Sequence, residues 1–137
     1  MRRIFQTKVS PVSFNIWLLL LRIAVGSFML THGWGKLQNI ISGDMKFADP
    51  IGIGEKLSLF LTVFAEVICS FMIILGLATR VAVLPLMITM LVAALIVHAD
   101  DPFNKKELPL LYFLTYLNLL VFGSGMFSID HIISKQN

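Results

Sequence analysis

Four long apolar segments separated by polar stretches dominate the chain. They lie near residues 14–35, 57–77, 81–97 and 108–122. A transmembrane helix needs roughly 20 predominantly apolar residues, so the first two segments are long enough to span a bilayer. The last two are shorter and need their flanks or a tilt to cross it. The pattern predicts an all-α fold, an up-and-down bundle of four transmembrane helices, with residues 1–137 forming one membrane domain.

The polar stretches predict how the helices are connected. Residues 38–56 carry glycines, a proline and charges, which are typical of an exposed or surface-lying loop. Only residues 78–80 separate the second and third segments, so these helices are expected to be antiparallel neighbours. Residues 98–107 form a second loop on the side of the first, and Pro85 is expected in about the first turn of its helix. The tail, 124–137, is predicted to lie at the membrane interface.

Polar residues interrupt the first apolar segment on one helical face. Residues at successive steps of four, three, four and three share a face of an α-helix, and here they are Arg22, Gly26, Met29, Gly33 and Lys36. We expect this face to meet the protein interior, since a buried arginine normally faces a partner or a cavity. The opposite face is expected to contact lipid through Leu18, Leu21, Val25 and Phe28.

Composition supports the membrane assignment. Of the 137 residues, 57% are hydrophobic and 14% are charged, and the mean hydropathy is +0.85. The first apolar run is too long for a signal peptide and has no small-residue cleavage site, so it is expected to stay as an anchor. The formal charge of +3 comes from residues at the chain ends and in loops, which is typical of membrane-flanking charges rather than a nucleic-acid-binding surface. The lipid bilayer is therefore the predicted partner, and nucleic acid is not.

Lysine and arginine counts leave the orientation evenly balanced. The side of the chain ends holds Arg2, Arg3, Lys8, Arg80 and Lys135, and the loop side holds Lys36, Lys46, Lys56, Lys105 and Lys106. The amino-terminal basic cluster flanks the first span, which favours cytoplasmic chain ends in a bacterial-type inner membrane.

The single cysteine, Cys69, excludes an intrachain disulfide, a CxxC redox pair and a cysteine metal cluster. His32 and His98 with one carboxylate offer metal ligands, but they come from separate helices without a diagnostic spacing. No metal site is predicted.

Glu66 lies near the middle of the second apolar segment, and an intramembrane carboxylate indicates a functional site. Two structural alternatives remain: a partner for Arg22, or a carboxyl that hydrogen-bonds between helices. At 1.5 Å per residue, Arg22 and Asn118 lie about 9 Å from the chain-end side, Glu66 and Tyr116 about 14–16 Å, and both histidines about 24 Å.

These depths predict two polar layers. Arg22 is expected to meet Asn118 or a ligand. Glu66 is expected to meet Tyr112, Tyr116 or His32, and a direct contact with Arg22 is strained by the depth difference. Nearer the loops, a small polar pocket mouth is predicted from His32, Lys36, His98, Glu107 and Trp34.

Three stretches carry a family resemblance. LLLLRIAVGSFMLTHGWGKL resembles the opening helix of DoxX-type membrane proteins, and FAEVICSFMIILGLATR resembles their second helix. HADDPFNKKELPLLYFLTYLNLLVFGSGMFSID is similar to their closing segment, so the likeness runs from Arg22 to Asp130. The resemblance implies a four-helix membrane bundle. It also implies relatives that include a membrane subunit linked to thiosulfate:quinone oxidoreduction and proteins associated with thiol- and superoxide-handling partners.

Two functional hypotheses follow. In the first, the chain is a redox-linked subunit that binds a quinone or similar amphipathic ligand. Glu66 then supplies protons, a tyrosine or histidine hydrogen-bonds the carbonyl, and Arg22 stabilises negative charge. No flavin, haem or iron–sulfur motif is evident, so electrons must come from a partner or a thiol substrate. In the second, the chain is a non-catalytic scaffold that joins a larger complex or a homo-oligomer. A transporter is disfavoured by small size and the lack of repeated halves.

Overall fold

The computed structural model describes residues 9–136 and confirms the all-α fold, since every regular element in that range is helical. The elements are α1 (Pro11–Ser42), α2 (Glu55–Val63), η2 (Phe64–Cys69), α3 (Ser70–Leu75), α4 (Thr79–Val92), η3 (Ala93–Val97), α5 (Phe103–Phe122) and α6 (Ile129–Ser134). The π-helical segments η2 and η3 continue the helices before them, which makes Glu55–Leu75 and Thr79–Val97 two unbroken rods. Arg2, Arg3 and Lys8, which favoured the predicted orientation, lie outside the described residues.

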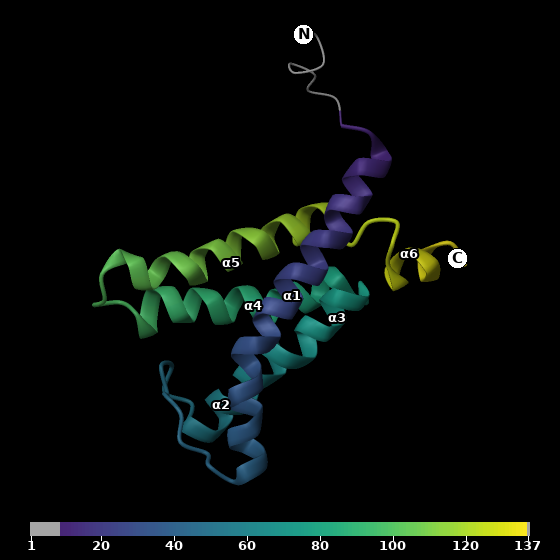
Figure 1. Ribbon diagram of the computed structural model, residues 1–137. Helices are drawn as coiled ribbons and strands as arrows, with labels where there is room; N and C mark the ends of the chain where they lie inside the picture. The colour runs from purple at the N-terminus through teal and green to yellow at the C-terminus, as the bar shows by residue number, and fades with distance from the viewer. Residues whose placement is uncertain (1–8, 137) are drawn as a thin grey trace.

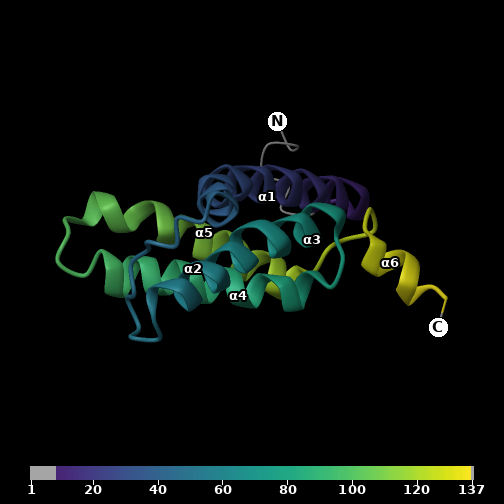
Figure 2. The same ribbon diagram turned by 90° about the horizontal axis from the view of Figure 1, so that it is seen from below.

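The helices form two antiparallel pairs that cross one another. α1 packs along α2, η2 and α3, while α4 packs along α5. Figure 1 shows α1 crossing α4 and α5 at a steep angle, and Figure 2 shows α1 lying along one face of the molecule. The start of α1, the α3–α4 turn and α6 lie towards one end, and the two longer loops lie towards the other (Figure 1).

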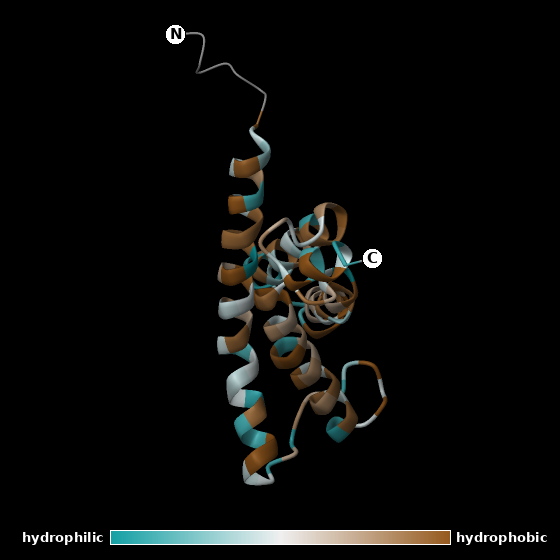
Figure 3. Ribbon diagram, turned by 90° about the vertical axis from the view of Figure 1, so that its right-hand side faces the viewer, coloured by the Kyte–Doolittle hydropathy of each residue, from teal (hydrophilic) through white to brown (hydrophobic). Residues whose placement is uncertain are grey.

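Three of the helical rods are long and apolar enough to span a membrane: Pro11–Ser42, Glu55–Leu75 and Thr79–Val97. α5 adds a fourth helix of 20 residues. Hydrophobic residues colour most of α1 in Figure 3. Large exposed side chains such as Trp17, Ile23 and Phe28 give these helices an apolar exterior that suits lipid rather than water. The chain is therefore an integral membrane protein.

Local sequence signals set the ends of α1. The Ser10 hydroxyl accepts a hydrogen bond from the Ser13 N–H (3.1 Å), and Pro11 fills the first helical position, where no N–H is needed. Gly43 ends the helix in a left-handed conformation (φ 82°). The 32 residues between them span about 48 Å, so α1 must tilt or extend beyond a hydrocarbon core of about 30 Å.

The predicted lipid-facing side of α1 is wrong for two of its four residues. Leu18 and Val25 are 2% and 6% exposed, because they lie four residues before and three residues after Arg22 and so share its face. Leu21 is half-buried, and Phe28 is 61% exposed, as expected for a lipid contact.

Two further expectations need correction. Pro85 lies seven residues into α4, in the second turn rather than the first. α5 begins at Phe103, five residues before the predicted start, because polar residues that lower the local hydropathy still form its opening turns.

Candidate functional site

A partly buried ion pair joins α1 to η2. The Lys36 ammonium nitrogen lies 2.5 and 2.6 Å from the two carboxylate oxygens of Glu66. The Glu66 side chain is 4% exposed and that of Lys36 is 28% exposed, so the carboxylate is enclosed while the ammonium reaches towards the surface. Within residues 9–136 this is the only Lys–carboxylate or Arg–carboxylate bridge.

Gly33 brings α1 close enough to η2 for this pair to form. A Cβ atom at position 33 would lie 2.7 Å from Val67 Cγ2 and 2.9 Å from Glu66 Cβ, which is closer than side chains tolerate. Glycine here allows the two backbones to approach, as small residues do between membrane helices.

We therefore expect Gly33→Ala to separate α1 from η2 and to lower the free energy of unfolding by about 1–3 kcal/mol, the usual range for overpacking. Gly35→Ala is the matched control, because a Cβ there meets nothing within 4 Å. Thermal unfolding in detergent, followed by circular dichroism, compares the two variants. Equal melting temperatures for both would contradict the close approach.

The ion pair lines a cavity of about 270 Å³ between α1, η2, α4, η3 and α5. Its polar side chains are His32, Lys36, Glu66, His98, Lys105 and Tyr112. Its apolar lining is Met29, Met90, Ala93, Leu108 and Pro109. The structure thus brings together five of the residues singled out from sequence, and Lys105 is one that sequence reasoning missed. Both π-helical segments contribute to the lining, and π-helical turns occur often at functional sites.

Three aromatic rings lead from this cavity into the protein. The His32 and Tyr112 rings meet edge to face, with centroids 5.9 Å apart. Tyr112 stacks on Tyr116 at 6.1 Å. Tyr116 is fully buried and lies outside the cavity lining, and its hydroxyl has no hydrogen-bond partner within the described chain.

The Lys36–Glu66 pair differs from the partners predicted for Glu66. Tyr112 and His32 share the cavity with Glu66, but neither hydrogen-bonds to it in the described structure. Side chains lean towards the start of their own helix, so Lys36 on α1 and Glu66 on the antiparallel rod lean towards each other. Two features of the sequence indicated the pair: this direction of the side chains, and the position of Gly33 and Lys36 on one face of the helix.

His98 lies at the loop end of the cavity. Its Nδ1 is 2.6 Å from an Asp101 carboxylate oxygen. The other residues predicted at this mouth, Trp34 and Glu107, are exposed and do not line the cavity. Among residues 9–136 no group of three or more histidine, cysteine, aspartate or glutamate side chains is placed to hold a metal ion.

Arg22 lies outside this cavity, fully buried, and its partners are backbone carbonyls. Its guanidinium donates to the Ile73 oxygen (3.4 Å) and to the Phe127 oxygen. The predicted contact with Asn118 is wrong: Asn118 is exposed, and its amide donates to the Leu114 oxygen of its own helix (2.8 Å). The similar depths of Arg22 and Asn118 did not make them neighbours, because Arg22 faces the protein interior and Asn118 lies on the exposed face of α5.

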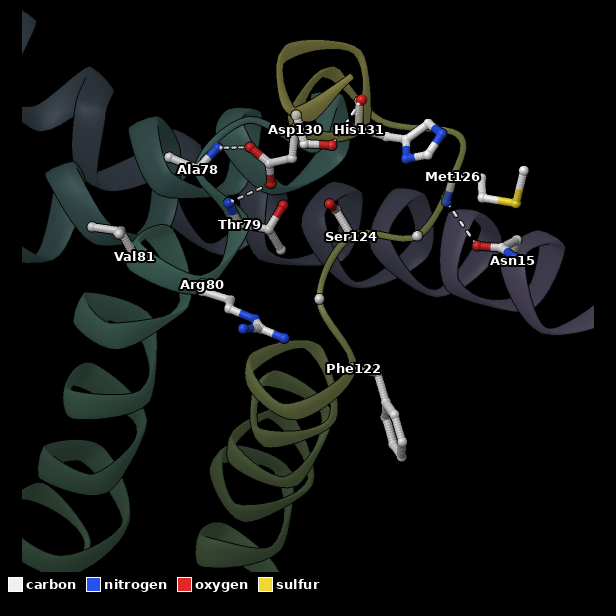
Figure 4. Close-up of a pocket in the computed structure, with 13 residues that line it drawn as sticks. Asn15, Ala78, Thr79, Arg80, Val81, Phe122, Ser124, Met126, Asp130 and His131 are labelled. Atoms are coloured by element: carbon white, nitrogen blue, oxygen red, sulfur yellow. Dashed lines mark hydrogen bonds between the residues drawn. The ribbon is translucent and has the colours of Figure 1, made fainter. Parts of the chain in front are cut away.

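Asp130 fastens the C-terminal segment to the α3–α4 turn (Figure 4). Its carboxylate accepts hydrogen bonds from the N–H groups of Ala78 (2.6 Å) and Thr79 (3.0 Å), which satisfy the start of α4. Its own N–H donates to the Gly76 oxygen at 2.9 Å. Burial acts to raise the pKa of Asp130, but hydrogen bonds, chiefly from Thr79, outweigh it and lower the pKa. At pH values above its unfolded-state pKa, the Asp130 carboxylate therefore stabilises the fold. This contribution is lost as the pH falls through the lowered native pKa.

Comparisons with known proteins identify relatives. A family model described as DoxX matches residues 17–99. The chain is 30% identical over 124 residues to the Bacillus subtilis (strain 168) protein named "Putative oxidoreductase CatD", covering 90% of this chain and 91% of that protein. It is 39% identical over 75 residues to a Haemophilus influenzae (strain Rd) protein named "Uncharacterized protein", covering 52% of this chain and 50% of the relative. No solved structure matches the chain.

Proposed function

The chain belongs to the DoxX family of membrane proteins, and from this premise we propose that it is a redox-linked subunit that binds a quinone in the Lys36–Glu66 cavity. The observation that carries the proposal is the cavity itself. It combines charged groups and a tyrosine with an apolar lining between membrane helices. Pockets of this make-up, largely apolar with a few convergent polar groups, are typical of small-molecule sites.

The polar groups suit a ligand with ring carbonyls. An ammonium group has three N–H donors, and Glu66 occupies two of those on Lys36, which leaves one for a ligand oxygen. The Tyr112 hydroxyl, the His32 and His98 rings and the Lys105 ammonium are the other groups at the cavity that can donate. A volume of about 270 Å³ is close to the lower end of ligand pockets, about 300 Å³, so it suits a single substituted ring.

Reduction of a quinone to a quinol adds two electrons and two protons. Glu66 and Lys36 are groups that can exchange protons at the ring oxygens. The electrons come from the redox centre of a partner protein or from a thiol substrate, because Cys69 is buried and lies outside the cavity lining. The name of the Bacillus subtilis relative, an oxidoreductase, agrees with this class of reaction.

We further propose that the protein lies in a bacterial-type inner membrane with both chain ends in the cytoplasm.

A scaffold that joins a larger complex is the second candidate, and one observation favours it. Arg22, the most buried charge in the described chain, bonds only to backbone oxygens, so this intramembrane charge holds segments of the chain together. A scaffold needs no ligand in the cavity, so a measurement of quinone binding distinguishes the two functions.

Quinone binding to the protein in lipid nanodiscs tests the proposal. Tyr112→Phe removes a hydroxyl at the cavity, and we expect it to weaken binding about 3- to 10-fold, the worth of one hydrogen bond. Tyr116→Phe is the matched control, because its hydroxyl lies outside the cavity, and binding should stay unchanged. Glu66→Gln should also weaken binding. Wild-type protein that binds no quinone would reject the redox function and favour the scaffold.

A further inference from the structure

A second hollow, of about 230 Å³, lies between α1 and α5 beside the cavity. Leu21, Ala24 and Phe28 line it from α1, and Leu111 and Thr115 line it from α5. The Thr115 hydroxyl donates to the Leu111 oxygen (2.8 Å), so it has no need of another partner. This groove therefore presents mainly hydrocarbon.

The crossing of the two helices creates the groove. Phe14 and Phe122 pack edge to face, with centroids 5.4 Å apart, where the start of α1 meets the end of α5. From there the helices separate towards the loop side (Figure 1). The small side chain of Ala24 leaves the widening space unfilled.

The groove and the cavity meet at two residues. Leu108 and Tyr112 line both hollows, so the Tyr112 ring stands between the charged compartment and the apolar one. At the outer edge of the groove, Phe28 and Leu111 are 61% and 53% exposed on the lipid-facing surface. A single molecule with a polar ring and a hydrocarbon tail would cover both compartments.

We infer that the ligand is a quinone bearing a polyprenyl tail, that its tail lies in the α1–α5 groove, and that it enters from the bilayer past Tyr112. This inference rests on the proposed quinone site and adds the class and path of its ligand. The groove matches an unbranched or methyl-branched hydrocarbon, while the charged cavity would exclude one. An ordinary phospholipid chain in the groove is the competing occupant.

The test compares two quinones with the same ring, one with a polyprenyl tail and one without, in nanodiscs containing wild-type or variant protein. Ala24→Phe fills the groove, and we expect it to weaken binding of the tailed quinone about tenfold, from lost hydrocarbon burial. Binding of the tail-less quinone should change less than about twofold. Ser27→Phe is the matched control, because Ser27 is an exposed small residue on α1 outside the groove, and it should leave both affinities unchanged.

Each other outcome overturns the inference. Unchanged binding of the tailed quinone to Ala24→Phe would mean that its tail lies outside the groove. An equal loss for both quinones would mean that the groove does not select the tail. Binding of neither quinone to wild-type protein would reject the proposed function itself. Thr115→Phe fills the groove from α5 and replaces Ala24→Phe if that variant does not fold.

Discussion

Lys36→Met is expected to destabilise the protein by about 3 kcal/mol, because it leaves the enclosed Glu66 carboxylate without its cation. Glu66→Gln should cost less, about 1 kcal/mol, since the Lys36 ammonium is 28% exposed and can turn towards water. The difference between the two losses follows from the difference in exposure of the two side chains.

The double variant Lys36→Met/Glu66→Gln should regain much of the stability lost in Lys36→Met, since it removes both charges. A coupling energy of about 2–3 kcal/mol, at the upper end for contacting residues, is expected, which leaves the double variant destabilised by about 1–2 kcal/mol. Unfolding in mixed micelles with increasing dodecyl sulfate measures the free energy of unfolding of the two single variants and the double variant. Lys56→Met, at an exposed lysine outside the described ion pairs, controls for loss of a positive charge. Additive effects of the two single changes would mean that the pair contributes no coupling.

The second large effect is expected at Arg22. Arg22→Met keeps an unbranched apolar stem but removes the guanidinium that donates to the Phe127 and Ile73 oxygens. The Ile73 oxygen keeps its bond from the Gly76 N–H (3.0 Å), so the Phe127 oxygen is the acceptor left unpaired. An unpaired buried acceptor costs about 1–3 kcal/mol, and we expect a loss of that size. The stability of Arg22→Lys should lie between that of the wild type and that of Arg22→Met. Its ammonium keeps the charge but lacks the planar fork that reaches two separate acceptors.

Limited proteolysis gives a readout specific to this site. Losing the bond to Phe127 should release the segment before α6, so Arg22→Met should be cut there faster than wild type. Arg80→Met is the matched control: Arg80 is exposed and makes one 3.3 Å bond to the Val121 oxygen, and a surface change of this kind costs less than about 0.5 kcal/mol. Identical cleavage of both variants would contradict a fastening role for Arg22.

Hydropathy predicted the helices well because span length and apolar content are properties of each segment alone. The same is true of Glu66, since an acid inside an apolar run is visible without any partner. The start of α5 was placed too late because helix formation needs backbone hydrogen bonds, not apolar side chains, and Asn104 and Lys105 provide them as readily as leucine.

The partners of the buried charges were harder to predict, for two physical reasons. Depth along the membrane is one coordinate, and Asn118 shares it with Arg22 while facing another direction. The true acceptors of Arg22 include a backbone carbonyl in the segment after α5, and backbone groups have no signature in sequence. Lys36 was placed at the correct end of the molecule, but its long side chain reaches back to Glu66.

The bond from Arg22 to Phe127 also bears on how the protein is made. The acceptor follows the donor by 105 residues, so the ribosome delivers the first helix to the membrane long before this partner exists. Lys36, by contrast, precedes Glu66 by 30 residues and is already present when the acid arrives. Biosynthesis therefore completes the Lys36–Glu66 site before the Arg22 site, and a chain that stops before its last dozen residues would leave Arg22 with its Ile73 acceptor but without the Phe127 one.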